Sequence, residues 1–430
     1  MTDENYVREL EARVATLEKE NQELRNRIEK LEHALLQKPR KEPPAFVKEN
    51  TQNHYTRPSG RPEGHEGVGR QKPDDIHEHV QLKPIAKCPD CGRAVRAKSR
   101  RKRYVTRLIP GRLENVEYDV PQSFCPHCRK TIEPVIPNTL PNNRFDLSFL
   151  LYVACLRMLG VSVDKIRFLL ETNYGLHVSS ATVTNNMRKL AKFLGDDYEQ
   201  LRKELLKEKQ VHGDETSWRV KGKNWWLWEF ISKRVAFFTV RKTRGHTVPV
   251  EVMKGYKGLF TADFWNAYNA LTCEKQRCWV HLKRELDKVL KYKPSKEFAR
   301  FASRLMRLYY WARSERNHGA KTRVFAEKRL QALLLEEYRN KDCKRLVKRL
   351  NRHQNELFVF CARRGAKSEN NHAERGIRPA VVVRKTTFGS QSAQGAQDTA
   401  VVMSLFQTAR LQDANFLEFM QKLADNRLQN

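Results

Sequence analysis

The sequence predicts a multidomain α+β protein with a coiled coil, a cysteine-rich metal module, a helical segment and a strand-rich region. Three observations lead to this fold class. A heptad pattern fills the first 37 residues, two C-x-x-C pairs follow a stretch rich in Pro and Gly, and strand-like runs appear after residue 208. The 430 residues suffice for about three domains of roughly 150 residues each.

The charge balance indicates the class of partner. The chain has 82 Lys and Arg against 50 Asp and Glu, a formal charge of +32. Such an excess predicts binding to a polyanion, above all nucleic acid, and disfavours an enzyme of ordinary charge balance that acts on acidic substrates. Nine cysteines without a signal-like N-terminus indicate thiols and metal ligands rather than disulfides. The longest apolar stretch, residues 147–163, is interrupted by Arg157, so no membrane partner is expected.

Residues 1–37 are expected to form a leucine-zipper coiled coil. The heptad places Val7, Val14, Asn21, Ile28 and Leu35 at a positions, and Leu10, Leu17, Leu24 and Leu31 at d positions. Mostly β-branched residues at a with Leu at d favour a parallel homodimer, and Asn21 would fix its register. The alternative is a single amphipathic helix packed on its own domain. Residues 38–75, with six Pro and four Gly, are predicted to be a flexible linker.

Residues 76–140 are predicted to be a DNA-binding zinc ribbon. Cys88 and Cys91 form one C-x-x-C pair, and Cys125 and Cys128 form another. Four thiolates suit one structural zinc ion and leave no open coordination position, whereas the alternative is four unrelated thiols. Residues 93–107 carry eight Lys or Arg and no acid. We expect this run to contact phosphates, the alternative being a solvated loop. The residues expected to do so are Arg100, Arg101, Lys102 and Arg103.

Residues 141–207 are predicted to form a helix-turn-helix-like domain. Asp146, Ser162 and either Ser179 or Ser180 are candidate N-caps of three successive helices. The third helix would read DNA in the major groove, unless the segment is a plain three-helix core. Its candidate DNA contacts are Thr182, Thr184, Asn185 and Arg188.

Carboxylates mark the strand-rich region. Residues 211–214 predict a short strand that ends in Asp214, and residues 258–263 predict another that ends in Asp263 and enters a helix. Residues 225–231 and 235–240 predict two further strands of an antiparallel meander. Glu374 falls in a short polar helix. Three converging acids would repel one another unless they bind two divalent cations, magnesium or manganese. The alternative for each is a solvated surface acid.

Four segments, VHGDETSW, TADFWNAYNAL, CWVHLKREL and NNHAERGIRPAVVVRKTTFGS, occur in this order and resemble the transposases of the insertion sequence 66 family. The resemblance covers roughly residues 1–425, most specifically 211–410. It implies a ribonuclease-H-like core with an Asp-Asp-Glu triad at Asp214, Asp263 and Glu374. That core would occupy residues 208–281 and 367–430, with residues 282–366 as a helical insertion. Glu369, where an Asp was expected, is a weak competitor for Glu374, and Glu215 is a weaker one for Asp214.

Two further groups follow from the resemblance. Cys278 and His281 resemble the C-x-x-H signature of related transposases, in which the His would lie beside the active site and contact the scissile phosphate or strand end. The alternative is a free thiol and a surface His. Arg375, Arg378, Arg384 and Lys385 follow the triad Glu and are expected to contact phosphates.

The function expected from this resemblance is that of a DNA transposase from a bacterial insertion sequence. Such a cytoplasmic, nucleoid-associated prokaryotic protein would bind double-stranded transposon ends and target DNA. It would cleave and join them by metal-dependent phosphoryl transfer, as a homodimer to which DNA could add further subunits. Two alternatives remain open. One is a nuclease with the same triad, and the other is a zipper-dimerised, zinc-ribbon DNA-binding regulator without catalysis.

Overall fold

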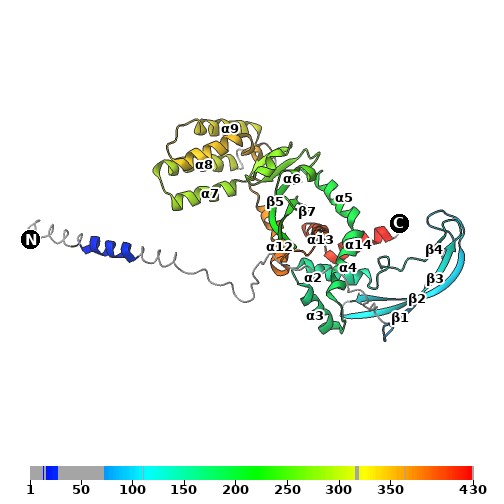
Figure 1. Ribbon diagram of the computed structural model, residues 1–430. Coiled ribbons are helices and arrows are strands. Elements are labelled where there is room, and N and C mark those ends of the chain that lie inside the picture. The colour runs from blue at the N-terminus through cyan, green and yellow to red at the C-terminus, as the bar shows by residue number, and fades with distance from the viewer. Residues whose placement is uncertain are drawn as a thin grey trace, which may run out of the picture. The chain divides into compact units, whose positions relative to one another are not determined.

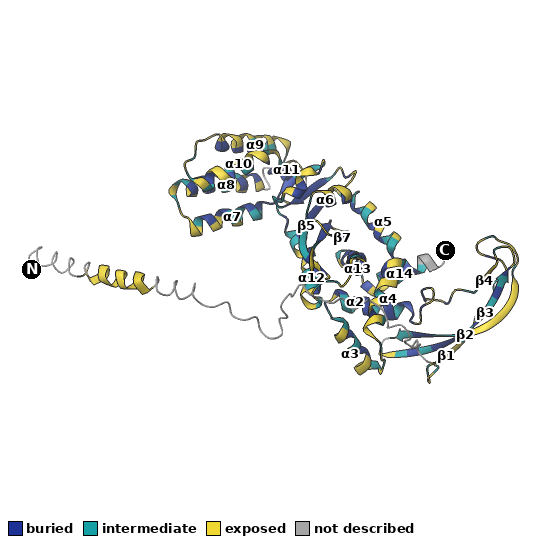
Figure 2. Cartoon of the chain, viewed as in Figure 1, coloured by how far each residue is buried: buried dark blue, intermediate teal, exposed yellow. Residues whose placement is uncertain are grey.

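The computed structural model describes residues 13, 16–27, 72–109, 111–314, 319–363 and 365–428. The chain divides into two compact units, residues 1–70 and 71–430. In the first unit, residues 16–27 are helical and exposed, and Leu17 and Leu24 are 51% and 57% exposed (Figure 2). Both leucines are d positions of the predicted zipper. Its outer heptad positions, and the predicted linker up to residue 71, lie outside the described residues.

In the second unit, the cysteine module is a twisted four-stranded sheet (Figure 1). Its strands are β1 (Glu78–Gln81), β2 (Arg96–Ile109), β3 (Arg112–Cys125) and β4 (Lys130–Ile132). β2 and β3 form a long antiparallel hairpin, β1 is parallel to β3, and β4 is antiparallel to β3. A small core that includes Val105, Val116 and Val120 stabilises this sheet.

Four helices follow the cysteine module. They are α2 (Leu147–Met158), α3 (Val163–Tyr174), α4 (Ser180–Phe193) and α5 (Gly195–Leu205). The predicted starts of the first three are confirmed, because Asp146, Ser162 and Ser179 each accept a hydrogen bond from a backbone N–H in the first turn. Gly175 ends α3 in the left-handed conformation at φ 59°, which lets the chain turn toward α4.

A five-stranded sheet in the order β7-β6-β5-β8-β9 forms the centre of this unit. Its strands are β5 (Gln210–Val220), β6 (Lys223–Ile231), β7 (Ala236–Arg241), β8 (Leu259–Ala262) and β9 (Glu274–Arg277). The meander β5-β6-β7 is antiparallel as predicted, whereas β8 and β9 run parallel to β5.

The predicted end of one strand was wrong. β5 does not end at Asp214, because residues 215–220 continue to pair with β6 as far as a turn at Lys221 and Gly222. Both turn residues have positive φ, as tight hairpin turns require. The helix predicted after Asp263 is present as a 3₁₀ helix, η1 (Asn266–Ala270).

Helices cover the sheet and extend its hydrophobic core. The remaining helices around it are α6 (Thr247–Val252), α12 (Asn371–Thr387), α13 (Ala393–Leu411) and α14 (Phe416–Leu428). α12 packs on β5 and β6, and α13 packs on β7 (Figure 1). One continuous apolar cluster joins the sheet with α12–α14 and with α2–α5. The helical segment therefore shares its core with the sheet.

A second group of helices lies between β9 and α12 in the sequence. These are α7 (Trp279–Tyr292), α8 (Lys296–Arg313), α9 (Ala320–Leu334), α10 (Lys341–Arg352), η3 (Gln354–Glu356) and α11 (Val359–Ala362). They enclose an apolar cluster of their own, with Trp279, Phe298 and Leu330 among its members. The helical pattern predicted for residues 282–366 is thus confirmed. Among the described helices, none is both long and apolar enough to cross a membrane.

Candidate active site and metal centre

Asp214 lies on the central strand of the five-stranded sheet, β5, directly opposite Glu229 of β6. Its pKa is raised to about 7, first by burial and then by the negative charges of Glu215, Asp263 and Glu374. Like charges act in this way only at short range. The structure therefore brings the three predicted acids into one region.

Asp263 follows β8 directly, and the parallel register explains why it meets Asp214. His212 of β5 pairs with Thr261 of β8, so each Asp lies two residues beyond a paired position at the same edge of the sheet. The Asp263 carboxylate accepts a hydrogen bond from the Trp265 N–H at 2.8 Å. This contact fixes the side chain where the chain turns into η1.

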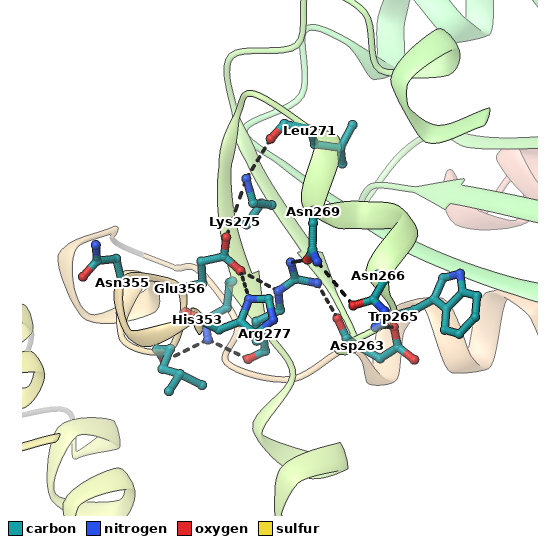
Figure 3. Close-up of polar contacts among 12 residues, drawn as sticks. Asp263, Trp265, Asn266, Asn269, Leu271, Lys275, Arg277, His353, Asn355 and Glu356 are labelled. Atoms are coloured by element: carbon teal, nitrogen blue, oxygen red, sulfur yellow. Dashed lines mark hydrogen bonds and ion pairs between the residues drawn. The ribbon is translucent and has the colours of Figure 1, made fainter. Parts of the chain in front are cut away.

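A buried arginine holds the Asp263 backbone in place (Figure 3). Arg277, only 1% exposed, donates from Nη1 to the Asp263 carbonyl at 2.8 Å, from Nη2 to Asn269 at 2.6 Å and from Nε to Glu356 at 2.6 Å. Burial alone would raise the pKa of Glu356, but a hydrogen bond from His353 and the Arg277 charge hold it at about 2. The ion pair therefore ties the Asp263 turn to η3 of the insertion.

Glu374 occupies the first turn of α12. Arg284 of α7 donates to both of its carboxylate oxygens at 3.2 Å. His281 Nε2 lies 3.7 Å from Glu374 Oε1, and the His281 side chain is 35% exposed. The predicted His therefore does lie beside the third acid, together with a cation that the sequence reasoning did not assign to the site.

Asn370 connects α12 to the sheet. Its side-chain amide donates to the Gly213 carbonyl at 2.8 Å, and its Oδ1 lies 3.1 Å from His212 Nδ1. Its backbone N–H donates to the buried Cys278 Sγ at 3.1 Å. Cys278 thus positions the start of the helix that carries Glu374, and it does so through the Asn370 backbone.

The two predicted competitors have other partners. Glu369 accepts a hydrogen bond from the Ser368 hydroxyl at 2.9 Å. Glu215 accepts hydrogen bonds from Arg244 Nε and Nη2 at 2.9 and 2.8 Å and from the Tyr268 hydroxyl. Both carboxylates are therefore already engaged by side chains of this protein.

Arg244 is itself stacked between two indoles. Its guanidinium carbon lies 4.5 Å from the Trp226 ring centroid and 3.9 Å from that of Trp265. The Trp265 indole N–H donates to the Arg244 carbonyl at 3.2 Å. This cation–π sandwich holds Glu215 beside the acids. The spacing of these residues in the sequence does not predict this stacking.

Glu229 is a further acid that the sequence reasoning missed. It is fully buried, and neither carboxylate oxygen has a hydrogen-bond partner among the described residues. Burial and the charge of Asp214 raise its pKa well above the ordinary value, which favours the neutral form. The sequence does contain one indication of this residue, because Glu229 is a lone acid inside the apolar run of residues 225–231.

The predicted phosphate contacts on the β2–β3 hairpin already have partners. Arg100 pairs with Asp119 at 2.7 Å, Arg101 with Glu133, and Lys102 with Glu117 at 3.2 Å. These three cations are nevertheless 45–65% exposed. Arg103 Nη2 donates to the Asn143 carbonyl at 3.1 Å. The hairpin surface therefore mixes positive and negative charge.

The other predicted DNA contacts are on α4 and α12. Exposed positions are Thr184, Asn185 and Arg188 on α4, and Arg375, Arg378 and Lys385 on α12. Thr182 is half-buried, and its hydroxyl lies 2.9 Å from that of Ser179. Arg384 Nη1 donates to Thr216 and Ser217 of β5 at 2.8 Å. Its guanidinium therefore joins α12 to the sheet.

The four predicted zinc ligands form a cluster. Their sulfur atoms all lie within 4.8 Å of one another, with Cys88 3.9 Å from Cys128 and Cys91 3.7 Å from Cys125. Four sulfurs 2.3 Å from a tetrahedral zinc ion would be about 3.8 Å apart. The Cys128 backbone N–H lowers the pKa of Cys125 to about 7, which favours its thiolate, whereas the hydrogen bond with Cys91 and burial raise the pKa of Cys128 to about 12. The cluster can bind one zinc ion.

Comparison with known proteins agrees with this arrangement. A search of curated proteins finds no match. The sequence model of the transposase IS66 family matches residues 154–398, which include Asp214, Asp263 and Glu374. Since this match spans more than half of the 430 residues, the chain belongs to the transposase IS66 family and is a DNA-binding enzyme that processes nucleic acid.

Proposed function

We propose that this transposase has a ribonuclease-H-like catalytic core in which Asp214, Asp263 and Glu374 form the active site. The observation that carries the proposal is that three acids, from β5, from the end of β8 and from α12, lie near enough to interact. Burial first, and then the charges of Glu215, Asp263 and Glu374, raise the Asp214 pKa to about 7. Three antiparallel strands followed by two strands parallel to the first support this type of core. An acid on the central strand and another after its parallel neighbour fit it as well.

The residues of this site suit divalent cations. The ligand set is made of carboxylate oxygens, which magnesium and manganese prefer. Burial and then the charges of Glu215, Asp263 and Glu374 raise the pKa of Asp214, so the site has negative charge that a cation would neutralise. Two such ions, held by Asp214, Asp263 and Glu374, would activate the attacking oxygen and neutralise charge on the phosphate.

The neighbouring side chains have roles of their own in this proposal. Arg284 neutralises Glu374 in the metal-free protein and, being 58% exposed, can also hold a DNA phosphate. His281 lies next to the same carboxylate and can donate a hydrogen bond to the strand end. Asn370 and Arg277 fix the backbone on either side. Hydrolysis at the transposon end would free a 3′ hydroxyl, which then attacks a target phosphodiester.

DNA binding would use surfaces outside the acids. The cysteine module, with one structural zinc ion on Cys88, Cys91, Cys125 and Cys128, and the exposed face of α4 are our candidates for end recognition. We also propose the divisions 76–140, 141–207, 208–281, 282–366 and 367–430 as working domains of the enzyme. The exposed cations of α12 would contact phosphate near the acids.

A parallel coiled coil of residues 1–37 would pair two subunits, so that two transposon ends are handled together. The exposed Leu17 and Leu24, one heptad apart, support this proposal because they have an apolar stripe to bury. Deleting residues 1–37 should convert dimers to monomers in analytical ultracentrifugation. An unchanged dimer affinity would place the main interface elsewhere. Asn21→Leu should strengthen association and give a mixture of oligomeric states.

The catalytic proposal is tested with labelled transposon ends, a plasmid target and magnesium. The parent protein should cut the ends and join them to the plasmid. Cleavage without joined products would indicate the nuclease alternative. Binding without any magnesium-dependent cleavage would indicate the regulator without catalysis, and would overturn the proposal.

A further inference from the structure

A large cavity opens at the end of the sheet opposite the acids. Its volume is about 1010 Å³, and it lies at the amino ends of the parallel strands β5 and β8. Three parts of the chain line it, together with Lys233. They are residues 206–210 and 212, residues 255 and 257–259, and residues 363, 365–367 and 372. The predicted DNA contacts all lie outside these segments.

The lining of this cavity is strongly basic. Its cationic residues are Lys207, Lys209, Lys233, Lys257, Arg363 and Lys367, against the single carboxylate of Glu208. Arg363 pairs with Glu274, but none of the five lysines has a carboxylate within ion-pair distance in the described part of the chain. All five are exposed. Unpaired like charges around one cavity favour a ligand with several negative charges.

Two histidines also line the cavity. His212 is 5% exposed and hydrogen-bonded to Asn370, and His372 Nε2 donates to the Ser232 carbonyl at 2.6 Å. The two imidazole rings meet edge to face, with centroids 5.4 Å apart. Leu206 and Leu259 also line the cavity. A lining that combines lysines with imidazole rings and leucines suits a ligand with phosphates and flat bases.

The size of the cavity distinguishes between forms of nucleic acid. Pockets for small organic molecules are roughly 300–1,000 Å³. A volume of about 1010 Å³ therefore accommodates a few nucleotides of one strand, whereas a duplex cannot enter. The cavity is also close to the acids. Gln210 in its lining lies four positions before Asp214 on β5, about 13 Å along a strand.

We propose that this cavity binds an unpaired DNA strand, a few nucleotides away from the phosphate held at Asp214, Asp263 and Glu374. The proposal rests on the proposed function, since it takes the strand to be DNA that the transposase has opened or cut. His372 of the lining lies in the first turn of α12. A strand in the cavity would therefore contact the segment that positions Glu374.

The test is a full-length triple variant, Lys207→Gln, Lys257→Gln and Lys367→Gln, which removes one charge from each wall. A matched control, Lys328→Gln, Lys341→Gln and Lys344→Gln, removes three exposed lysines from α9 and α10. Fluorescence anisotropy with a labelled oligothymidylate of 12 nucleotides measures strand affinity against salt concentration. Thermal melting checks that both variants fold.

The salt dependence gives the expected size of the effect. Each phosphate contact on a single strand contributes about 0.7 to the slope of log affinity against log salt. Three lost contacts should lower the slope by about 2 and weaken binding roughly 100-fold at 0.1 M salt. The control should bind the oligonucleotide nearly as the parent does. A double-stranded end should bind the cavity variant with little change.

Three results would overturn the proposal. They are unchanged strand affinity in the cavity variant, an equal loss in the control, or equally strong competition by pyrophosphate, which would indicate a free phosphate compound.

Cleavage by the parent is measured in parallel. If the parent cuts no DNA while the oligonucleotide result holds, the proposed function fails and the strand site stands. If the parent cuts and the cavity variant binds normally, the strand site alone fails.

Discussion

The cysteine cluster and the carboxylate cluster are assembled in opposite ways. Each cysteine pair belongs to one turn, and local contacts such as Gly92 N–H to the Cys88 carbonyl at 2.8 Å set its shape. The acids come instead from β5, β8 and α12, far apart in the chain. Cysteine placement therefore depends on two turns and one hairpin, whereas acid placement depends on the whole sheet and its helices.

This difference explains why the acids need so much support. Arg277 holds the Asp263 carbonyl, Asn370 holds the start of α12, and Gly213 leaves room for the Phe260 ring that packs against β5. The small core beside the cysteines is modest by comparison. We expect the cysteine module to depend on its metal for stability, and the acid site to depend on packing.

The largest expected effect is loss of zinc. Cys88→Ser should release the ion and disorder the β1–β4 module, because a four-thiolate zinc site contributes on the order of 10 kcal/mol to folding. Metal analysis and limited proteolysis measure the two consequences, and Cys273→Ser, at a half-buried thiol outside the cluster, is the control. The comparison breaks down if freshly purified protein contains no zinc, or if loss of zinc unfolds the five-stranded sheet as well.

Next in size is the effect of neutralising an acid. Asp214→Asn, Asp263→Asn and Glu374→Gln each remove one anionic ligand while nearly keeping the shape of the side chain. We expect cleavage and joining to fall by at least about 10⁴-fold, or about 5.4 kcal/mol, with end binding unchanged. Gel assays of cleavage and binding separate these readouts.

Glu369→Gln is the control for the third ligand, since that carboxylate is bonded to Ser368. It should keep most of the activity. A dead Glu369→Gln beside an active Glu374→Gln would show that the third ligand is misassigned.

A smaller effect is expected at the support of the acid site. Arg277→Met removes a buried guanidinium and leaves Glu356 without its main partner, which should cost about 3–5 kcal/mol of stability. Arg345→Met breaks an ion pair with Glu285 in which the Arg345 side chain is 49% exposed. This change should cost less than about 1 kcal/mol of stability. Urea unfolding measures both. Equal losses would mean that the buried network has no special part in holding Asp263.

The smallest expected effect is a pH dependence. The Asp214 pKa is about 7 in the metal-free fold, against an ordinary value of 3.8. The folded state therefore holds this proton more tightly, and metal-free stability should fall as pH rises from about 4 to about 7. Manganese needs the deprotonated carboxylate, so its affinity should be about tenfold, or 1.4 kcal/mol, higher at pH 8 than at pH 6.

Titration of manganese, followed by thermal melting at pH 6 and pH 8, measures this difference. Asp214→Asn removes the titrating group and should flatten the dependence. A parent protein whose manganese affinity is the same at both pH values would place the ion away from Asp214.

The contrast between local and distant contacts also decides what could be predicted. Helix starts at Asp146, Ser162 and Ser179 were predictable because a cap is a local contact. β9 was missed because Glu274–Arg277 has no apolar pattern. Its buried residues Gln276 and Arg277 make polar contacts with the distant residues Leu357 and Glu356, which the local sequence does not reveal.

Within the site, the sequence led to the three acids and to His281, but not to their surroundings. Arg384 was expected on phosphate, yet its Nη1 bonds to β5, which only the packing of α12 brings near. Arg284 was missed for the same reason, since α7 and α12 meet only in the folded chain. Glu229 was missed because its place opposite Asp214 depends on the register of the β5–β6 hairpin. The mid-strand position of Asp214 depended on the hairpin turn at Lys221 and Gly222.

One glycine in α12 has a genetic consequence. A methyl group at Gly376 would collide with the Glu229 carboxylate and with Ile231 Cδ1, two side chains that have no space to move into. An alanine at this position would therefore push the helix that carries Glu374 away from the sheet. The weakened packing would hold the helix in place at low temperature and fail at a higher temperature. We expect Gly376→Ala to make transposition temperature-sensitive, so that the element could be silenced by warming its host.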